Sequence, residues 1–206
     1  MKFLIMHGSF GSPDGNWFRW IESELKKLGH EVILEQFPVD DWDEVNKIGP
    51  KESMNYSPIE SLTSWDEFFA TSILPKIKDE KTGFVGHSIA PVFILHMLAK
   101  YDIKFKTALF VSPFFNIPNT PDVWQFYPVN KTFYSYDFNF DQLKEKVDVS
   151  HVIYSDDDPY VPISEPILFA NKLGSKVHIV PNGKHLGSNF TELPLLLDLI
   201  KQDTQP

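Results

Sequence analysis

The feature that most constrains the fold is a regular alternation of short apolar runs with longer helical stretches. Most runs are rich in Val, Ile, Leu and Phe over four to six residues, which is typical of strands covered on both faces. The predicted strands span residues 3–6, 31–36, 82–85, 107–111, 149–154 and 176–180. This rhythm predicts a parallel sheet, because parallel strands need helical crossovers.

The stretches between the runs carry helix signals. In the first, Trp17, Ile21 and Leu25 fall on one face at helical spacing, and Gly29 ends the helix. Ser64-Trp65-Asp66-Glu67 matches a capping box and predicts a helix that runs towards Leu74. The predicted helices span 16–28, 64–74, 89–100, 163–173 and 191–201. We therefore expect one α/β domain over residues 1–206, with a mostly parallel sheet of about six strands and helices on both faces.

Composition excludes several classes of protein. Of the 206 residues, 42% are hydrophobic and 15% aromatic, which excludes disorder and coiled coils. The absence of cysteine excludes disulfides, thiolate metal sites and a cysteine nucleophile. A net charge of −9 without a basic stripe argues against nucleic acid or an anionic membrane surface as a partner. No run approaches the roughly 20 apolar residues of a membrane span, and the cytoplasm is the expected location.

Two segments break the alternation. Residues 40–61 are polar and contain Pro50 and Pro58, and residues 113–140 combine four prolines with many aromatic side chains. Loops of this length inside a domain are usually functional, so we expect lid or rim segments beside a site. The alternative is that both are irregular surface excursions whose aromatic residues pack against the core.

The strongest local motif is Gly86-His87-Ser88-Ile89-Ala90, between a predicted strand and a predicted buried helix. A nucleophile elbow needs this strand–turn–helix context and small residues two positions before and after the serine. Gly86 and Ala90 meet the steric demand, although the usual pattern ends in glycine. A plain turn that joins strand to helix is the alternative, since short matches of this kind also arise by chance.

A nucleophilic serine needs a base, and the base needs an orienting acid. Predicted strand 149–154 runs into Ser155-Asp156-Asp157-Asp158-Pro159, which supplies three candidate acids, although aspartates before a proline also suit an ordinary turn. Predicted strand 176–180 runs into a loop with His185, the candidate base. The chain order Ser, Asp, His matches an α/β-hydrolase. His185 is favoured for its loop position over the other histidines, which are His7, His30, His87, His96, His151 and His178.

An oxyanion hole must present backbone N–H groups where negative charge develops. One donor is expected at Ile89, the residue after the nucleophile. The second is expected in the glycine-containing loop after the first strand, His7-Gly8-Ser9-Phe10-Gly11-Ser12-Pro13. Ser9 is the first choice in that loop and Phe10 the next.

The loop after the first strand, followed by Asn16-Trp17-Phe18, resembles the opening of a small serine hydrolase family of the α/β-hydrolase superfamily. The family includes retinoblastoma-binding protein 9 and the YdeN-like bacterial proteins. Gly86-His87-Ser88, Asp157-Asp158-Pro159-Tyr160-Val161-Pro162 and Gly183-Lys184-His185 resemble its catalytic blocks. The resemblance covers nearly the whole chain. It implies Ser88 as nucleophile, His185 as base and Asp158, directly before the proline, as the acid.

The chain departs from the family pattern at three points. Ala90 stands where some relatives have glycine, which affects the turn rather than the triad. The retinoblastoma-binding motif requires a cysteine that this chain lacks, so that partner is not carried over. Segment 40–61 is longer than expected for the family and is predicted to reshape the rim of the pocket.

Together these features predict a serine hydrolase that cleaves a small carboxylic ester, or a related acyl compound, through an acyl-enzyme. The aromatic stretch from Phe114 to Phe140 is expected to form an apolar acyl pocket, with no metal or organic cofactor. Expected pocket residues are Phe10, Trp124, Phe126 and Tyr127. The alternative is a hydrolase-like scaffold with little turnover that binds a protein partner, whose identity the sequence leaves unknown. Dehalogenase and epoxide hydrolase chemistry is excluded, because position 88 is serine rather than aspartate.

Overall fold

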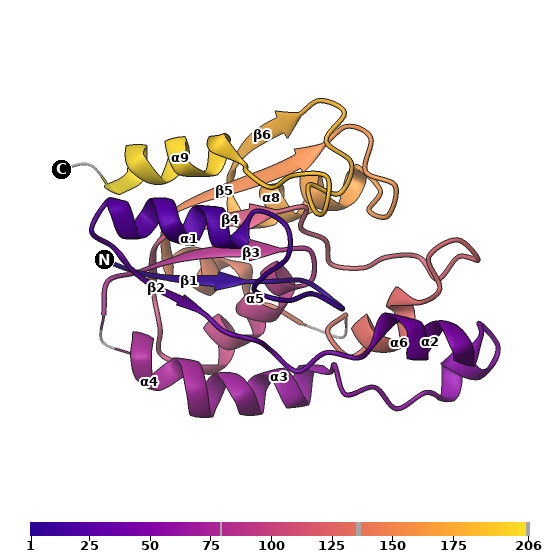
Figure 1. The fold of residues 1–206 in the computed structure, drawn as a ribbon. Coiled ribbons are helices and arrows are strands. Elements are labelled where there is room, and N and C mark those ends of the chain that lie inside the picture. The colour runs from indigo at the N-terminus through magenta and orange to yellow at the C-terminus, as the bar shows by residue number, and fades with distance from the viewer. Residues whose placement is uncertain (79, 135–136, 205–206) are drawn as a thin grey trace.

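The computed structural model describes residues 1–78, 80–134 and 137–204. Within them, six parallel strands form one sheet in the order β2-β1-β3-β4-β5-β6 (Figure 1). The strands are β1 (Lys2–Met6), β2 (Glu31–Leu34), β3 (Thr82–His87), β4 (Phe105–Val111), β5 (Val147–Ser155) and β6 (Lys176–Val180). The predicted α/β fold is confirmed, with a sheet that is parallel throughout.

The described helices connect and cover these strands. They are α1 (Phe18–Lys27), α2 (Trp42–Ile48), α3 (Leu62–Phe68), α4 (Leu74–Ile77), α5 (Ala90–Lys100), α6 (Phe126–Asn130), α7 (Phe140–Lys144), α8 (Ser164–Leu173) and α9 (Pro194–Thr204). A 3₁₀ helix (Glu52–Asn55) follows α2, and a π-helix (Phe69–Ile73) joins α3 to α4. No helix among the described residues has the length and apolar character needed to cross a membrane.

The helices bury the two faces of the sheet in two separate cores. Successive side chains of a strand point to opposite faces. In β1, Phe3 and Ile5 therefore pack in the core beneath α1 and α9. Leu4 and Met6 pack in the core on the other face, with α3, α5 and α8. Figure 1 shows α1 and α9 together on one side of the strands and α3 and α4 on the other.

The helix predicted from the capping box is present, but its start was wrong. The N-cap is Ser61 rather than Ser64, and the helix begins at Leu62. The Ser61 hydroxyl accepts from the backbone N–H of Ser64, and the Ser64 hydroxyl accepts from that of Ser61, so Ser64 holds the third helical position. A serine at this position replaces the usual Glu or Gln, so the sequence pattern places the start of the helix three residues too late.

The two long segments outside the alternation meet at one end of the molecule. Segment 40–61 contains α2, and segment 113–140 contains α6, with residues 135 and 136 outside the described part. The rings of Trp42 and Phe126 lie 5.6 Å apart, and the Gln125 amide donates to the Asn46 side chain at 2.9 Å. Figure 1 shows α2 and α6 side by side, projecting beyond the sheet. These two segments thus form one layer at the carboxyl ends of the strands.

Candidate active site

Ser88 occupies a sharp turn between β3 and α5. Its φ is 65°, in the left-handed region that side chains with a Cβ rarely adopt. Its backbone N–H donates to the Val111 carbonyl at 2.9 Å, which fixes the turn to β4. A Cβ on Gly86 would lie 2.4 Å from Cζ of Phe84 and 3.3 Å from Cβ of Ala90, so the turn needs glycine at position 86.

Ser88, His185 and Asp158 meet at the carboxyl edge of the sheet. His185 Nε2 lies 3.0 Å from Oγ of Ser88, and His185 Nδ1 lies 2.7 Å from Oδ2 of Asp158. The three side chains come from the loops after β3, β5 and β6. The imidazole therefore bridges a hydroxyl and a carboxylate, which is the arrangement required to activate a serine.

The structure separates the roles of the three consecutive aspartates. Asp158 accepts from His185 with one oxygen and from the backbone N–H groups of Tyr160 and Val161 with the other, at 2.9 and 3.0 Å. Asp156 and Asp157 instead accept from backbone N–H groups of the His185 loop. Hydrogen bonds from Lys184 and Ser155 lower the pKa of Asp157 to about 2. Only Asp158 of the three contacts the imidazole.

The loop that carries His185 has a strained backbone that β5 holds in place. Asn182, Lys184 and Leu186 have φ values of 55°, 52° and 50°. Such conformations persist where surrounding contacts determine them. The Ser155 hydroxyl accepts from the Gly183 N–H at 2.7 Å, and Asp157 accepts from the Lys184 N–H at 2.8 Å. Ser155 and Asp157, which precede Asp158 in the chain, thus fix the loop that carries His185.

Sequence reasoning missed His87 as a supporting residue. Its Nε2 donates to the backbone carbonyl of His185 at 2.8 Å, and the Ser112 hydroxyl donates to the same carbonyl at 3.0 Å. Burial, with a smaller contribution from His185, lowers the pKa of His87 to about 3, so this ring is neutral at physiological pH. Its place directly before Ser88 in the motif was the available signal.

The loop after β1 lies against Ser88. A Cβ on Gly8 would stand 2.6 Å from Cβ of Ser88, so glycine is needed for this approach. The N–H of Phe10, the second choice for the oxyanion donor, donates to Glu60 Oε2 at 3.1 Å and is therefore engaged. Ser9 remains the favoured residue in this loop, and Ile89 is the N-cap of α5.

His7 is a second supporting residue that the sequence analysis missed. Its Nε2 accepts a hydrogen bond from the Phe37 N–H at 3.1 Å, so its Nδ1 carries the proton and donates to the Gly8 carbonyl at 2.9 Å.

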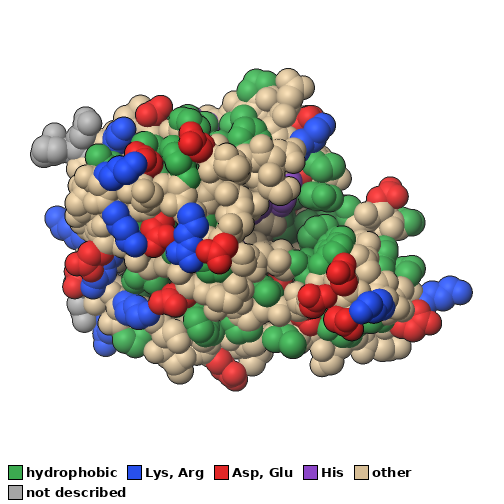
Figure 2. All heavy atoms as spheres, in the orientation of Figure 1, with side chains coloured by type: hydrophobic (Ala, Val, Ile, Leu, Met, Phe, Trp, Pro, Cys, Tyr) green, Lys and Arg blue, Asp and Glu red, His purple; other side chains and the backbone are tan. Residues whose placement is uncertain are grey.

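A cleft of about 420 Å³ opens over Ser88 and His185. Figure 2 shows a hollow in this face of the molecule with apolar side chains gathered beside it. Of the predicted pocket residues, Phe10 and Phe126 line the cleft, whereas Trp124 and Tyr127 are not among the described lining residues. Tyr160 lines it too and was not predicted as a pocket residue.

Aromatic side chains form a series of edge and tilted contacts that runs from Trp42, outside the cleft lining, to the residues of the cleft. Ring centroids lie 5.1 Å apart for Trp42 and Phe10, 5.8 Å for Phe10 and Phe126, and 5.3 Å for Phe126 and Tyr160. Tyr160 then contacts the His185 ring at 5.3 Å. An apolar wall thus extends from the rim segments to the imidazole.

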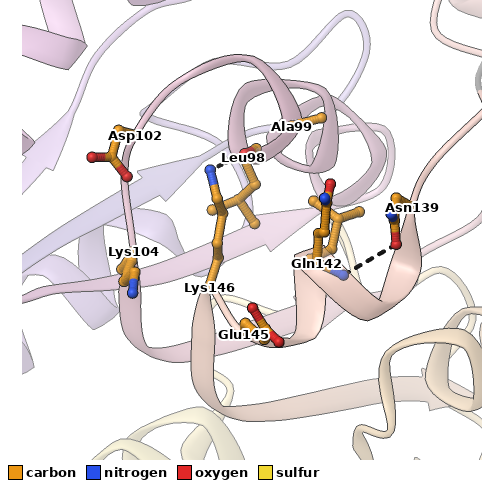
Figure 3. Close-up of a pocket in the computed structure, with 9 residues that line it drawn as sticks. Leu98, Ala99, Asp102, Lys104, Asn139, Gln142, Glu145 and Lys146 are labelled. Atoms are coloured by element: carbon orange, nitrogen blue, oxygen red, sulfur yellow. Dashed lines mark hydrogen bonds between the residues drawn. The ribbon is translucent and has the colours of Figure 1, made fainter.

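A second cavity, of about 330 Å³, lies where α5 ends and β4 and β5 begin (Figure 3). Lys146 reaches across it and donates to the carbonyls of Leu98 and Tyr101 at 2.7 and 2.8 Å. The Lys146 ammonium group therefore pairs with backbone carbonyls at the C-terminal end of α5 that have no partner within the helix. This cavity is at the amino ends of the strands, opposite Ser88. Among the described residues, no cluster of three or more His, Asp or Glu side chains is arranged to hold a metal ion.

A six-stranded parallel sheet with an elbow serine, a histidine and an aspartate at its carboxyl edge defines an α/β-hydrolase. The chain belongs to the serine hydrolase family, whose model matches residues 63–202. The comparison with curated proteins gave no match.

Solved structures share this fold along the whole chain. The ydeN gene product from B. subtilis is 22% identical, with a TM-score of 0.78 over 98% of this chain and 97% of that one. Est1E from Butyrivibrio proteoclasticus, solved with ferulic acid bound, is 16% identical, with a TM-score of 0.65 over 98% and 86%. The carboxylesterase CesB from Bacillus subtilis is 14% identical, with a TM-score of 0.59 over 98% and 82%.

Proposed function

We propose that this chain hydrolyses a carboxylic ester through an acyl-enzyme formed on Ser88, with His185 as general base and Asp158 as the orienting acid. The observation that carries the proposal is the position of the His185 ring, with one nitrogen 3.0 Å from the Ser88 hydroxyl and the other 2.7 Å from Asp158. Esterases among the structures of the same fold support this reaction class.

In the first half of the reaction, Ser88 Oγ attacks the ester carbonyl carbon while its proton passes to Nε2 of His185. The carbonyl π electrons move to oxygen, and the N–H groups of Ser9 and Ile89 stabilise this oxyanion. The tetrahedral intermediate then collapses. The bond to the alcohol oxygen breaks, and that oxygen takes the proton from His185 as the alcohol leaves.

In the second half, water attacks the acyl carbon and gives a proton to His185. Collapse of this intermediate breaks the bond to Ser88 Oγ, which recovers the proton, and the carboxylic acid departs. Asp158 accepts hydrogen bonds from His185 and from two backbone N–H groups, and it keeps a proton on Nδ1 of His185.

The aromatic wall supports an ester with an apolar or aryl group. Phe10, Phe126 and Tyr160 line a cleft of about 420 Å³, a volume suited to a small-molecule substrate. We further propose that segments 40–61 and 113–140 act as its rim, because Trp42 and Phe126 place one aromatic side chain from each against Phe10.

Hydrolysis of a p-nitrophenyl ester series from acetyl to octanoyl tests the proposal, with S88A and H185A beside the natural protein. Turnover that collapses in both variants is expected, and the preferred chain length measures the cleft. Labelling with a serine-reactive phosphonate, located by peptide mass spectrometry, is expected at Ser88. If the natural protein shows no turnover and Ser88 is not labelled, the proposal is overturned, and a binding scaffold is then the favoured function.

A further inference from the structure

A buried carboxyl group that the mechanism above does not use lies behind the loop after β1. The Glu60 side chain is fully buried, and its Oε2 accepts from the backbone N–H of Phe10 at 3.1 Å. Its second oxygen, Oε1, is buried without a hydrogen-bond partner in the described structure. A carboxyl group placed this way is retained at a cost, because a buried polar atom without a partner destabilises the fold. Its position therefore calls for a functional explanation.

The loop that Glu60 contacts has a conformation that needs external support. Phe10 has a φ of 55°, in the left-handed region, and Gly11 N–H donates to the Gly8 carbonyl at 3.1 Å to close the turn. Glu60 holds the N–H of Phe10. The Ser9 hydroxyl donates to the Asn130 side-chain carbonyl at 2.6 Å. Ser9, whose N–H is proposed to face the oxyanion, is thus fixed through its side chain and through the peptide group that follows it.

Glu60 is itself fixed by a second buried carboxylate. Asp40 accepts from the backbone N–H groups of Ile59 and Glu60, at 3.1 and 2.8 Å, and from the hydroxyl of Tyr56 at 2.6 Å. The Asp40 contacts orient the backbone of Glu60, and the Glu60 side chain is then free to contact the loop after β1 at Phe10. Two more buried polar atoms without hydrogen-bond partners, the side-chain nitrogen of Asn130 and the hydroxyl of Tyr134, belong to residues of the same region.

We propose that Glu60 is a positioning residue for ester hydrolysis. In its neutral form it holds the Ser9–Phe10 backbone against the oxyanion, and its ionisation slows acyl transfer by placing a negative charge behind that backbone. The inference rests on the function proposed above. Glu60 acts through the loop and takes no part in bond making or proton transfer.

The surroundings of Glu60 determine when it ionises. Burial, with a smaller contribution from the Asp40 carboxylate, raises the pKa of Glu60 to about 8, against the opposing hydrogen bond from the Phe10 N–H. Burial, with a smaller contribution from Glu60, raises the pKa of the Tyr134 phenol above its ordinary value, so Tyr134 adds no charge near Glu60 at neutral pH. Glu60 is therefore neutral below about pH 8 and charged above it. Activity should fall as the pH rises through this value.

The test is the pH dependence of kcat and KM for p-nitrophenyl ester hydrolysis between about pH 6 and pH 10, corrected for spontaneous hydrolysis. The natural protein should lose about tenfold in kcat above pH 8, with KM little changed, because a nearby charge acts on the oxyanion. E60Q keeps an acceptor for the Phe10 N–H but cannot ionise. It should stay active at pH 7 and lack the alkaline fall.

D203N is the matched control, since Asp203 is also a buried carboxylate but pairs with His151 at the opposite end of the sheet. It should retain the alkaline fall. D40N offers a second probe if E60Q does not fold. It removes the negative charge of Asp40, which raises the pKa of Glu60, so the alkaline fall should move to lower pH.

The experiments distinguish a failure of the Glu60 proposal from a failure of the proposed function. An E60Q profile that matches the natural protein, or a D40N profile that does not move, overturns the role of Glu60 even when Ser88 reacts with the phosphonate. An alkaline fall that E60Q and D203N both remove also overturns it, because the effect is then not specific to this loop. No labelling of Ser88 in the natural protein overturns the proposed function itself.

Discussion

The side chain of His87 donates a hydrogen bond from Nε2 to the backbone carbonyl of His185 at 2.8 Å. The residue next to the proposed nucleophile therefore fixes the main chain of the proposed base. Because His87 is buried and neutral, this contact positions His185 without adding a charge beside it. A residue next to one member of the proposed triad thus positions the loop of another member. Asp156 and Asp157, beside Asp158, do the same, because they accept hydrogen bonds from the loop that carries His185.

Substitution of the three aspartates by asparagine should give sharply unequal effects. D158N should lower kcat by about 10⁴-fold, because an amide favours the wrong tautomer of the histidine. D156N and D157N keep an oxygen that accepts from the His185 loop, so each should lower kcat by less than about tenfold. Steady-state kinetics on the three variants checks this. Equal losses would contradict the assignment of the acid to Asp158.

The close approach of the loop after β1 to Ser88 predicts a steric effect. In G8A the new methyl group would stand 2.6 Å from Cβ of Ser88, so one of the two backbones must move. A displacement of about 1 Å at a reacting group lowers kcat roughly 100-fold. G15A is the matched control, since its methyl group would meet an ordinary 3.5 Å contact with the Ser12 carbonyl. Comparable activity of G8A and G15A would refute the proposed approach.

The buried state of His87 predicts a pH-dependent stability. Its pKa is lowered to about 3 in the folded protein, against 6.5 for an unperturbed histidine. Between these values the unfolded chain binds a proton that the folded chain does not. The free energy of unfolding should therefore decrease as the pH falls from about 6.5 to about 3, with a contribution on the order of a few kcal/mol.

Urea denaturation at a series of pH values measures this dependence, with H87Q as the variant that cannot titrate. The slope should be smaller in H87Q but not zero, because burial also lowers the pKa of His7 and His151. An unchanged slope would show that His87 does not carry the effect.

The sheet, Ser88 and His185 could be predicted from local sequence patterns, whereas the choice of Asp158 among three aspartates came from the family resemblance. Apolar runs mark strands, and the carboxyl ends of parallel strands meet at one edge, which brings Ser88, Asp158 and His185 into range. The residues that were missed depend on contacts distant in sequence. Glu60 meets Phe10 across 50 residues, and His87 meets His185 across 98. A local motif can mark a residue such as His87, but it does not specify which distant residue that side chain contacts.

The pocket shows the same limit in its aromatic residues. Trp124, Phe126 and Tyr127 share one short aromatic stretch, and composition alone did not distinguish them. The structure does, because α6 begins at Phe126 and places this ring against Phe10 and Tyr160 in the cleft. Which side of a short helix faces the substrate depends on how that helix docks.

This difference predicts distinct effects of alanine substitution on substrate preference. F126A removes a ring that contacts Trp42, Phe10 and Tyr160, so it should raise KM for long-chain and aryl esters by about tenfold. A tenfold change corresponds to about 1.4 kcal/mol, which is the free energy expected for the loss of one aromatic contact. KM for the acetyl ester should change little, because so short an acyl group does not reach the rim. W124A and Y127A are the matched controls from the same stretch, and both should keep the chain-length profile of the natural protein. A profile altered equally in all three variants would mean that the segment acts as a whole, as a lid does, rather than through the one ring that lines the cleft.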